Sequence, residues 1–207
     1  MSKPDADIPI IVLAAGASRR MRGIDKLMLP VDGRPLLRRQ VDLARAVTSG
    51  PVIVTLPPPP HARYGALAGS GATAVPVADA EEGMNAALRA GFAALPGSSR
   101  AAMLLLADLP DLSEDDLRNV LHSVDLNSDF LVWRGATQDG EPGHPVVFAA
   151  PLFARIARLS GDSGGREVVA AAGNRVALIR LPGRHARRDL DTPEDWARWR
   201  AAHQNAR

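Results

Sequence analysis

The fold of this chain is decided by residues 8–37, which read IPIIVLAAGASRRMRGIDKLMLPVDGRPLL. Ile10–Leu13 is a short apolar, β-branched run, which is the pattern of a strand buried on both faces. At Ala14–Gly16 the side chains become very small, so the backbone can turn sharply and approach a ligand closely. A basic set that suits polyphosphate follows within eight positions: Arg19, Arg20, Arg22 and Lys26. The stretch predicts a strand, a turn and a phosphate-binding loop; the alternative is a solvated basic turn.

Lys26 stands out because the chain uses arginine for nearly all of its positive charge. Among 25 lysines and arginines, the only lysines are Lys3 and Lys26. An ammonium is a compact point charge, which suits phosphate oxygens in places where the planar guanidinium fits less well. We therefore expect Lys26 to contact phosphate, with retention by chance as the alternative.

The order LAAGASRRM and then DKLMLPVDGRPLL resembles the opening of the small nucleotidyltransferases that attach CMP or GMP to the molybdenum cofactor. More broadly, it is similar to pyrophosphorylase-type nucleotidyltransferases with a glycosyltransferase-A-like Rossmann core. Neither the GxxxxGK[ST] fingerprint nor GxGxxG with a later acidic residue is present. The resemblance implies that Arg20 and Lys26 act on a triphosphate. It also implies a nucleotide-binding set: Leu13, Ala14, Ala15, Gly16 and Lys26.

Length and composition place broad limits on the protein. The 207 residues suit one well-buried domain and are few for two, so we expect a single nucleotidyltransferase domain over 1–207. With 46% hydrophobic residues and no apolar run near the roughly 18 residues of a membrane span, we expect a globular protein without one. The polar opening at 1–9 does not resemble a signal peptide, and the lack of cysteine excludes disulfides and agrees with a cytoplasmic location.

The charge distribution argues against nucleic acid as a partner. The formal net charge is only +2, and the arginines are spread among acidic residues. Aromatic residues, which would stack on bases, make up 4% of the chain. We expect neither nucleic-acid nor membrane binding.

Strand and helix patterns alternate along the chain. Strands are expected near residues 10–13, 52–56, 74–77, 101–107, 130–133, 144–148 and 175–181. Helices are expected near 35–48, 62–68, 84–95, 113–124, 151–159 and 165–172, and from 192 onward. This alternation predicts an α/β fold, a three-layer α/β/α sandwich with a mostly parallel, Rossmann-like sheet of the nucleotide-diphospho-sugar transferase type. Ligands of such sheets bind beyond the carboxyl ends of the strands.

Two carboxylates are candidate ligands for Mg²⁺. Asp108 follows the most apolar strand, in LLLADLPDL, and would face the phosphate loop there, although a cap of the turn around Pro110 is the alternative. RDLDTPEDW resembles the family's late motif, which implies that Asp191 supplies a second ligand. Asp189 would point the same way in an extended segment. A position next to a helix N-cap is the alternative for Asp191.

The segment 79–91, DAEEGMNAALRAG, resembles the part that cups the base and ribose in this family. The resemblance implies three further nucleotide-binding residues: Asp79, Gly83 and Met84. Alanines occupy positions 86 and 87, where serine is expected, so backbone contacts would have to replace side-chain contacts. The apolar residues at every fourth position also predict an ordinary core stripe.

Two segments resemble the acceptor side of the molybdenum cofactor cytidylyltransferases: GHP at 143–145 and GDSGGR at 161–166. A histidine flanked by glycine and proline, and a glycine-rich helix start, could both meet an anionic acceptor. The resemblance implies that His144 and Asp162 bind the acceptor. A lone histidine is more often structural, and a structural role is the alternative for His144.

The expected activity is transfer of a nucleoside monophosphate. An acceptor phosphate would attack the α-phosphorus of an NTP and release pyrophosphate, with Mg²⁺ as cofactor and no protein nucleophile. Arg20, Lys26 and Asp108 would be the catalytic residues. The acceptor implied by the resemblance is molybdopterin, with transient contacts to molybdoenzyme maturation proteins.

The choice of base and acceptor stays open. Ala15 favours CTP, because guanylyl members tend to carry glycine there, whereas Asp25–Lys26 also looks like guanylyl members. The alternatives are a GTP-using enzyme, an enzyme that uses a sugar or isoprenoid phosphate, and a non-catalytic nucleotide-binding accessory protein.

Overall fold

The computed structural model describes residues 7–204 of the chain. Residues 1–6, with Lys3 and most of the polar opening, and residues 205–207 lie outside the described part. The centre is a seven-stranded sheet of order β5-β4-β1-β6-β8-β7-β9. Its strands are β1 (Ile10–Leu13), β4 (Val52–Leu56), β5 (Thr73–Pro76), β6 (Ala101–Leu106), β7 (Val132–Ala136), β8 (Pro142–Ala149) and β9 (Val176–Arg180).

The sheet is mostly parallel, as predicted. β5, β4, β1 and β6 run side by side in one direction, and β7 and β9 pair in parallel. β8 is antiparallel to both β6 and β7, so it is the reversed strand of this sheet. Its register pairs Leu104 with Val146, so the start of β8 lies beside the end of β6. The carboxyl edge of the parallel strands therefore also receives His144.

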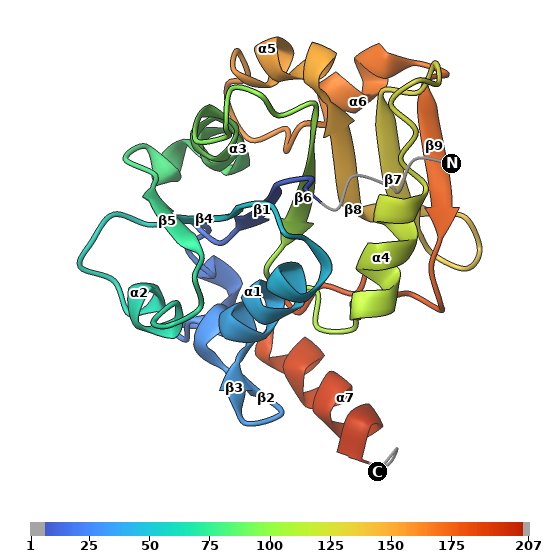
Figure 1. Ribbon diagram of the computed structural model, residues 1–207. Helices are drawn as coiled ribbons and strands as arrows, with labels where there is room; N and C mark the ends of the chain where they lie inside the picture. Colours follow the sequence, from blue (N-terminus) through green and yellow to red (C-terminus); the bar gives the residue numbers. More distant parts are fainter. Residues whose placement is uncertain (1–6, 205–207) are drawn as a thin grey trace.

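Helices cover both faces of the sheet, which confirms the three-layer α/β/α sandwich (Figure 1). One layer contains α1 (Leu36–Val47), α2 (Arg63–Ala66), α4 (Glu114–His122) and α7 (Pro193–Gln204). The other contains α3 (Met84–Ala93), α5 (Phe153–Ile156) and α6 (Arg166–Ala172). The short 3₁₀ turns are η1 (Arg19–Met21), η2 (Lys26–Met28), η3 (Ala80–Glu82) and η4 (Ala150–Leu152).

The alternation of side chains along β1 builds a core on each face. Ile10 and Val12 pack into the cluster under α1 and α4, whereas Ile11 and Leu13 pack into the cluster under α3. The β1–α3 contact is close: a Cβ on Gly91 would lie 2.6 Å from Cγ2 of Ile11. α3 thereby brings the segment before it to the end of β1.

Some boundaries differ from those expected. The strand expected at 130–133 begins at Val132, because Phe130 lies 40% exposed before the sheet. The helix expected at 151–159 is split into η4 and α5 and ends at Ile156. A two-stranded hairpin of β2 (Pro30–Val31) and β3 (Arg34–Pro35) was not expected. It delays α1 by one residue, so Pro35 stands before that helix instead of in its first turn.

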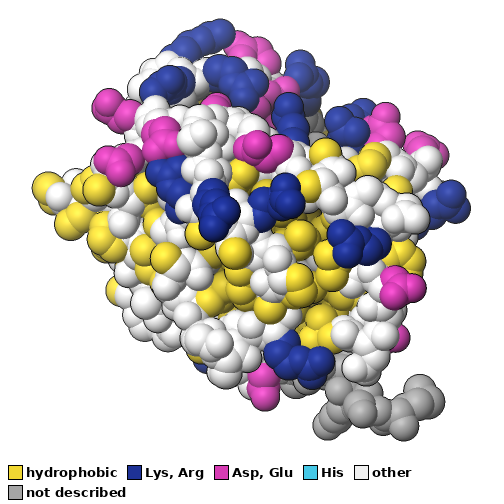
Figure 2. Space-filling model, turned by 90° about the horizontal axis from the view of Figure 1, so that it is seen from above, with side chains coloured by type: hydrophobic (Ala, Val, Ile, Leu, Met, Phe, Trp, Pro, Cys, Tyr) yellow, Lys and Arg dark blue, Asp and Glu magenta, His cyan; other side chains and the backbone are white. Residues whose placement is uncertain are grey.

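Charges of both signs are intermixed on the surface. On the face seen in Figure 2, Lys and Arg side chains are mixed with Asp and Glu toward the top, and several Lys and Arg side chains border the exposed hydrophobic side chains in the middle. Within residues 7–204, no helix has the length and apolar character needed to cross a membrane.

Candidate functional site

The segment that we call the nucleotide loop, residues 14–25, leaves the sheet between β4 and β6. Its first residue is fixed by the strands, because the Ala14 amide donates to the Thr55 carbonyl at 3.0 Å. The next three amides, of Ala15, Gly16 and Ala17, donate no hydrogen bond to any residue that the structure describes. Consecutive free N–H groups after a strand form a suitable site for phosphate oxygens.

Lys26 follows this loop in the chain and forms hydrogen bonds with the two predicted metal ligands. Its Nζ donates to Asp108 Oδ2 and to Asp191 Oδ1, both at 2.6 Å. The Lys26 side chain is 12% exposed. Burial alone would lower its pKa, but the two carboxylates outweigh burial and raise it, so the ammonium stays charged. Arg20 also forms an ion pair with Asp191.

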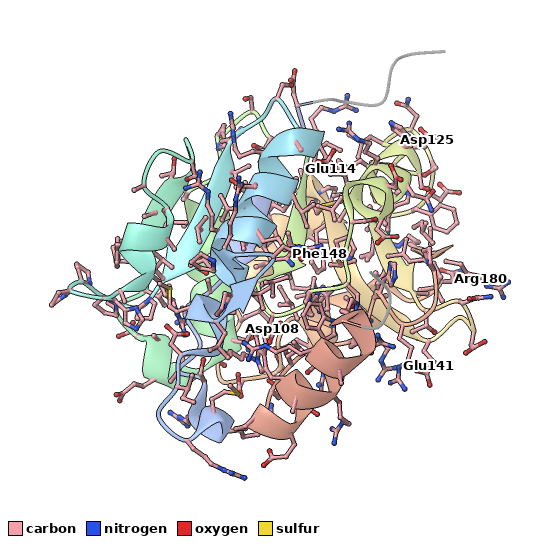
Figure 3. The ribbon with its side chains drawn as sticks, turned by 90° about the horizontal axis from the view of Figure 1, so that it is seen from below. Asp108, Glu114, Asp125, Glu141, Phe148 and Arg180 are labelled. Carbon is pink, nitrogen blue, oxygen red and sulfur yellow. The ribbon has the colours of Figure 1, made fainter. Side chains whose placement is uncertain are left out.

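Backbone contacts hold these groups in place. Asp25 caps η2 by accepting from the Leu27 amide at 3.0 Å, which fixes the start of the turn that carries Lys26. The Leu190 amide donates to the Asp108 carbonyl at 3.2 Å, so the segment before α7 runs alongside the end of β6. In Figure 3, Asp108 lies between the opening segment and α7, in agreement with these contacts.

Asp191 owes its place to the start of α7. Thr192 and Asp195 form a reciprocal cap: Asp195 Oδ2 accepts from the Thr192 amide at 2.9 Å, and Thr192 Oγ1 accepts from the Asp195 amide at 3.1 Å. Burial would raise the pKa of Asp191, but Lys26 and Arg20 lower it. Burial and the neighbouring Asp191 raise the pKa of Asp189. Asp191 is therefore the more strongly anionic of the two.

The residues present fit a divalent cation that is shared with phosphate. Asp108 Oδ1 is buried and has no partner among the described residues, although Oδ2 is bound by Lys26. No cluster of three or more metal-binding side chains occurs within residues 7–204. Mg²⁺ typically uses one or two carboxylates and completes its shell with phosphates and water. Asp108 and Asp191 supply such an incomplete set.

The segment expected to hold the base meets one of the segments expected to hold the acceptor. Asp162 Oδ1 accepts from the Met84 amide at 2.6 Å, at the first residue of α3. Gly83 has φ of 117°, and a Cβ there would lie 2.5 Å from Asp162 Oδ1. Asp162 therefore caps α3 in this structure. Asp79 lies one turn earlier, where its carbonyl accepts from the Glu82 amide.

His144 lies at the carboxyl edge of the sheet, where its Nδ1 is buried without a partner among the described residues. Burial, together with the nearby charge of Arg134, lowers the pKa of His144 to about 3. Its ring is thus neutral at physiological pH. The sequence offered no signal for Arg134, whose Nε donates to the Gly143 carbonyl at 2.8 Å.

Arg63 is a second residue that sequence reasoning missed. It is 1% exposed and is bonded to both ends of the nucleotide loop. By contrast, a cleft of about 400 Å³ beside Asp111 and Trp199 is lined by none of the predicted site residues. Lys26, Asp108 and Asp191 meet outside that cleft, and Met84 and Asp162 form a separate contact.

The structure is an α/β sandwich in which Lys26, Asp108 and Asp191 meet beyond the ends of the parallel strands. The MobA-like NTP transferase domain matches residues 10–176. The molybdenum cofactor guanylyltransferase of Rhodobacter capsulatus is 33% identical over 199 residues, which are 91% of this chain and 92% of that protein. The bifunctional protein GlmU of Pelobacter propionicus is 28% identical over 116 residues, or 56% of this chain; these residues span only 25% of GlmU.

Solved structures agree with these relatives. The crystal structure of Rv0371c from Mycobacterium tuberculosis H37Rv is 30% identical with a TM-score of 0.80, over 94% of this chain and 98% of that one. A structure of Rv0371c in complex with manganese has a TM-score of 0.76 at 29% identity, over 93% and 97% of the two chains. This chain belongs to the MobA-like NTP transferase family and is a nucleotidyltransferase.

Proposed function

We propose that this enzyme transfers the nucleoside monophosphate of an NTP, with CTP favoured, to a phosphate-bearing acceptor in the presence of Mg²⁺. The observation that carries this proposal is the position of Lys26 between Asp108 and Asp191, at the end of a loop that begins with three amides without a partner among the described residues. A cation and two carboxylates beside a phosphate-binding turn suit phosphoryl chemistry, in which catalysis is mainly positioning and charge neutralisation.

Each predicted residue has a separate task. The amides of Ala15 and Gly16 bind phosphate oxygens, while Arg20 and Lys26 neutralise the charge that develops on the leaving pyrophosphate. Asp108 and Asp191 would hold Mg²⁺, which supplies further neutralisation between the phosphates when it is bound. The acceptor phosphate is already ionised at neutral pH, so no side chain has to act as nucleophile.

Lys26 has a second task before substrate arrives. Two carboxylates that approach one ammonium at 2.6 Å would repel each other without it. Lys26 therefore keeps the carboxylates together in the free protein. With Mg²⁺ held by Asp108 and Asp191, the ammonium of Lys26 would be free to bind phosphate oxygens.

The preference for CTP is supported by the surroundings of Asp25. Both carboxylate oxygens are occupied, because Oδ1 and Oδ2 accept from Arg63 at 2.7 and 2.8 Å. Oδ1 also accepts from the Leu27 amide. The carboxylate of Asp25 is therefore already bonded and is not free to bind the edge of a guanine, although Asp25–Lys26 resembles guanylyl members. The Rhodobacter relative, which is named a guanylyltransferase, keeps GTP as the alternative.

We propose molybdopterin as the acceptor, bound on the side of the site where His144 and Asp162 lie. Arg134 adds positive charge there, and burial and then the nearby Arg187 and Arg166 lower its pKa. Several cations at one place favour an anionic group such as the acceptor phosphate. Contacts with molybdoenzyme maturation proteins remain part of the proposal.

The test is pyrophosphate release with Mg²⁺, purified molybdopterin and CTP, GTP, ATP or UTP in separate reactions. Release with CTP, abolished in Asp108→Asn, supports the proposal. The control is Asp42→Asn on α1, which loses its ion pairs with Arg34 and Arg38, whereas Asp108→Asn loses its ion pair with Lys26. Release with GTP alone would overturn the proposed preference for CTP. Saturable NTP binding without release would point to another acceptor, such as a sugar phosphate, or to the non-catalytic accessory protein.

A further inference from the structure

Arg63 is a fully buried cation whose whole hydrogen-bonding capacity is directed at the nucleotide loop. Its Nη1 donates to the carbonyls of Ala14 at 2.6 Å and Gly16 at 2.8 Å. Its Nη2 donates to Ser18 Oγ at 3.3 Å and to Asp25 Oδ1 at 2.7 Å, and its Nε donates to Asp25 Oδ2 at 2.8 Å. These five bonds use the five N–H donors of a guanidinium.

The bonds to the two carbonyls decide where the neighbouring amides point. In a trans peptide, C=O and the following N–H point in opposite directions. The carbonyls of Ala14 and Gly16 turn inward to Arg63, so the amides of Ala15 and Ala17 turn away from it. These amides belong to the unpartnered set described above. Arg63 thus orients the groups that we assign to phosphate.

The loop needs such a support, because its own backbone is strained. Ser18 and Arg22 have φ values of 50° and 53°, in the left-handed region that residues other than glycine rarely adopt. Such conformations persist where the surroundings fix them. Arg63 binds at residue 18 and also at both ends of the loop, through residues 14, 16 and 25.

We propose that Arg63 is a positioning residue that holds the nucleotide loop in its triphosphate-binding conformation before the nucleotide arrives. The identity of the ligand rests on the proposed function. A loop that is binding-competent for only a fraction of the time binds more weakly by that fraction. Arg63 raises the fraction of molecules whose loop is in the binding conformation. It does so by contacting the loop, without contacting the nucleotide.

The chemistry of the contact explains why arginine is needed. The planar fork binds the two oxygens of Asp25 side by side and still reaches two carbonyls. A lysine has three donors on one nitrogen and cannot span these positions. We therefore expect Arg63→Lys to behave more like Arg63→Met than like the wild type.

The experiment compares Arg63→Met, Arg63→Lys and the control Arg38→Met. Arg38 is the control, because it too binds a carboxylate and a backbone carbonyl, those of Asp42 and Ala68, away from the loop. Calorimetric titration with CTP and with GTP, each with Mg²⁺, gives the dissociation constant. Trypsin, which cleaves after arginine, reports the order of the loop at Arg19, Arg20 and Arg22.

For both Arg63 variants we expect nucleotide affinity to fall about tenfold or more, because the competent fraction falls. Cleavage at the loop should accelerate before other sites are cut, and saturating nucleotide should slow it again. Arg38→Met should match the wild type in both respects. Thermal unfolding shows whether an Arg63 variant has lost its fold. If it has, Asp25→Asn is tested instead, because this variant weakens the same contact from the loop side.

Unchanged affinity and unchanged loop cleavage in folded Arg63 variants would overturn the inference. A kcat that falls while nucleotide affinity stays at the wild-type value would also contradict it. The proposed function fails differently: the wild type then binds nucleotide but releases no pyrophosphate with any acceptor, and the effect of Arg63 on binding persists. Wild-type protein that binds no nucleotide would overturn both.

Discussion

At the scale of single residues, the account depends most on the ammonium of Lys26. Lys26→Met removes the cation from between Asp108 and Asp191 while keeping the length of the side chain. We expect kcat/KM for CTP to fall about 100-fold or more, the scale seen when one preorganised charge that stabilises the transition state is lost. Steady-state pyrophosphate release at several CTP concentrations measures this change.

The same variant should bind a metal ion more tightly when no nucleotide is present. Lys26 competes for the carboxylates in the free protein, so its removal frees both for Mn²⁺. Electron paramagnetic resonance of free Mn²⁺ gives the affinity, and Arg34→Met, which removes an exposed partner of Asp42, serves as the control. Unchanged or weaker Mn²⁺ binding in Lys26→Met would contradict competition between the ammonium and the metal ion for these carboxylates.

His144 makes a separate prediction about pH. Its pKa is about 3 in the folded protein and near 6.5 when unfolded, so the unfolded state binds more protons between these values. Stability therefore falls as pH drops from about 6.5 toward 3, by at most about 1.4 kcal/mol per pH unit from this residue. His144→Asn should flatten the dependence, measured by urea unfolding at pH 7, 6, 5 and 4. An equal slope in both proteins would contradict a buried neutral histidine.

At the scale of elements, the start of α7 is expected to matter for activity as well as for stability. Thr192→Ala removes the cap next to Asp191 and should cost about 1 kcal/mol of unfolding free energy. Ser113→Ala is the matched control, because Ser113 and Asp116 form the same kind of cap on α4. Both variants should lose similar stability by urea unfolding, but only Thr192→Ala should also lose turnover. Equal activities of Thr192→Ala and Ser113→Ala would show that the position of Asp191 does not depend on the cap.

The turn before α3 gives a second prediction at this scale. Gly83→Ala places a Cβ against Asp162 and keeps a φ that alanine disfavours, so it should cost about 1–3 kcal/mol. We expect KM for the nucleotide to rise as well, because the base-side and acceptor-side segments meet there. The control is Gly97→Ala, where the added Cβ meets open space. If Gly83→Ala behaved like Gly97→Ala in urea unfolding and in KM, the tight contact with Asp162 would be excluded.

At the scale of the whole molecule, the fold could be predicted because two kinds of local pattern agree. Apolar runs such as Ile10–Leu13 and 101–107 identify buried strands, and the amphipathic stretches between them identify covering helices. The β2–β3 hairpin was missed, although Asp32–Gly33 between Val31 and Arg34 is a hairpin signal that could have found it. A strand of two residues is too short to show the alternation of apolar and polar side chains that predicts a strand.

The site could be predicted only in part, for a physical reason. Asp108 and Lys26 lie next to strong local signals, a buried strand and a basic loop, and the parallel sheet brings them to one edge. Arg63 lies 38 positions from Asp25, in a short helix after a run of prolines, and nothing local marks its burial. Tertiary contacts of this kind have no spacing that a sequence pattern could reveal. The same holds for the bond between Asp162 and Met84.

The most direct test of the central claim follows the phosphorus atoms of CTP. Two reactions with Mg²⁺ and molybdopterin use CTP labelled at the α- or at the γ-phosphorus. Nucleotidyl transfer predicts that the α-label appears in the molybdopterin product while the γ-label leaves as pyrophosphate, and that Asp108→Asn forms neither product. A γ-label released as inorganic phosphate, with the α-label left in CDP, would contradict attack at the α-phosphorus and the function proposed for this site.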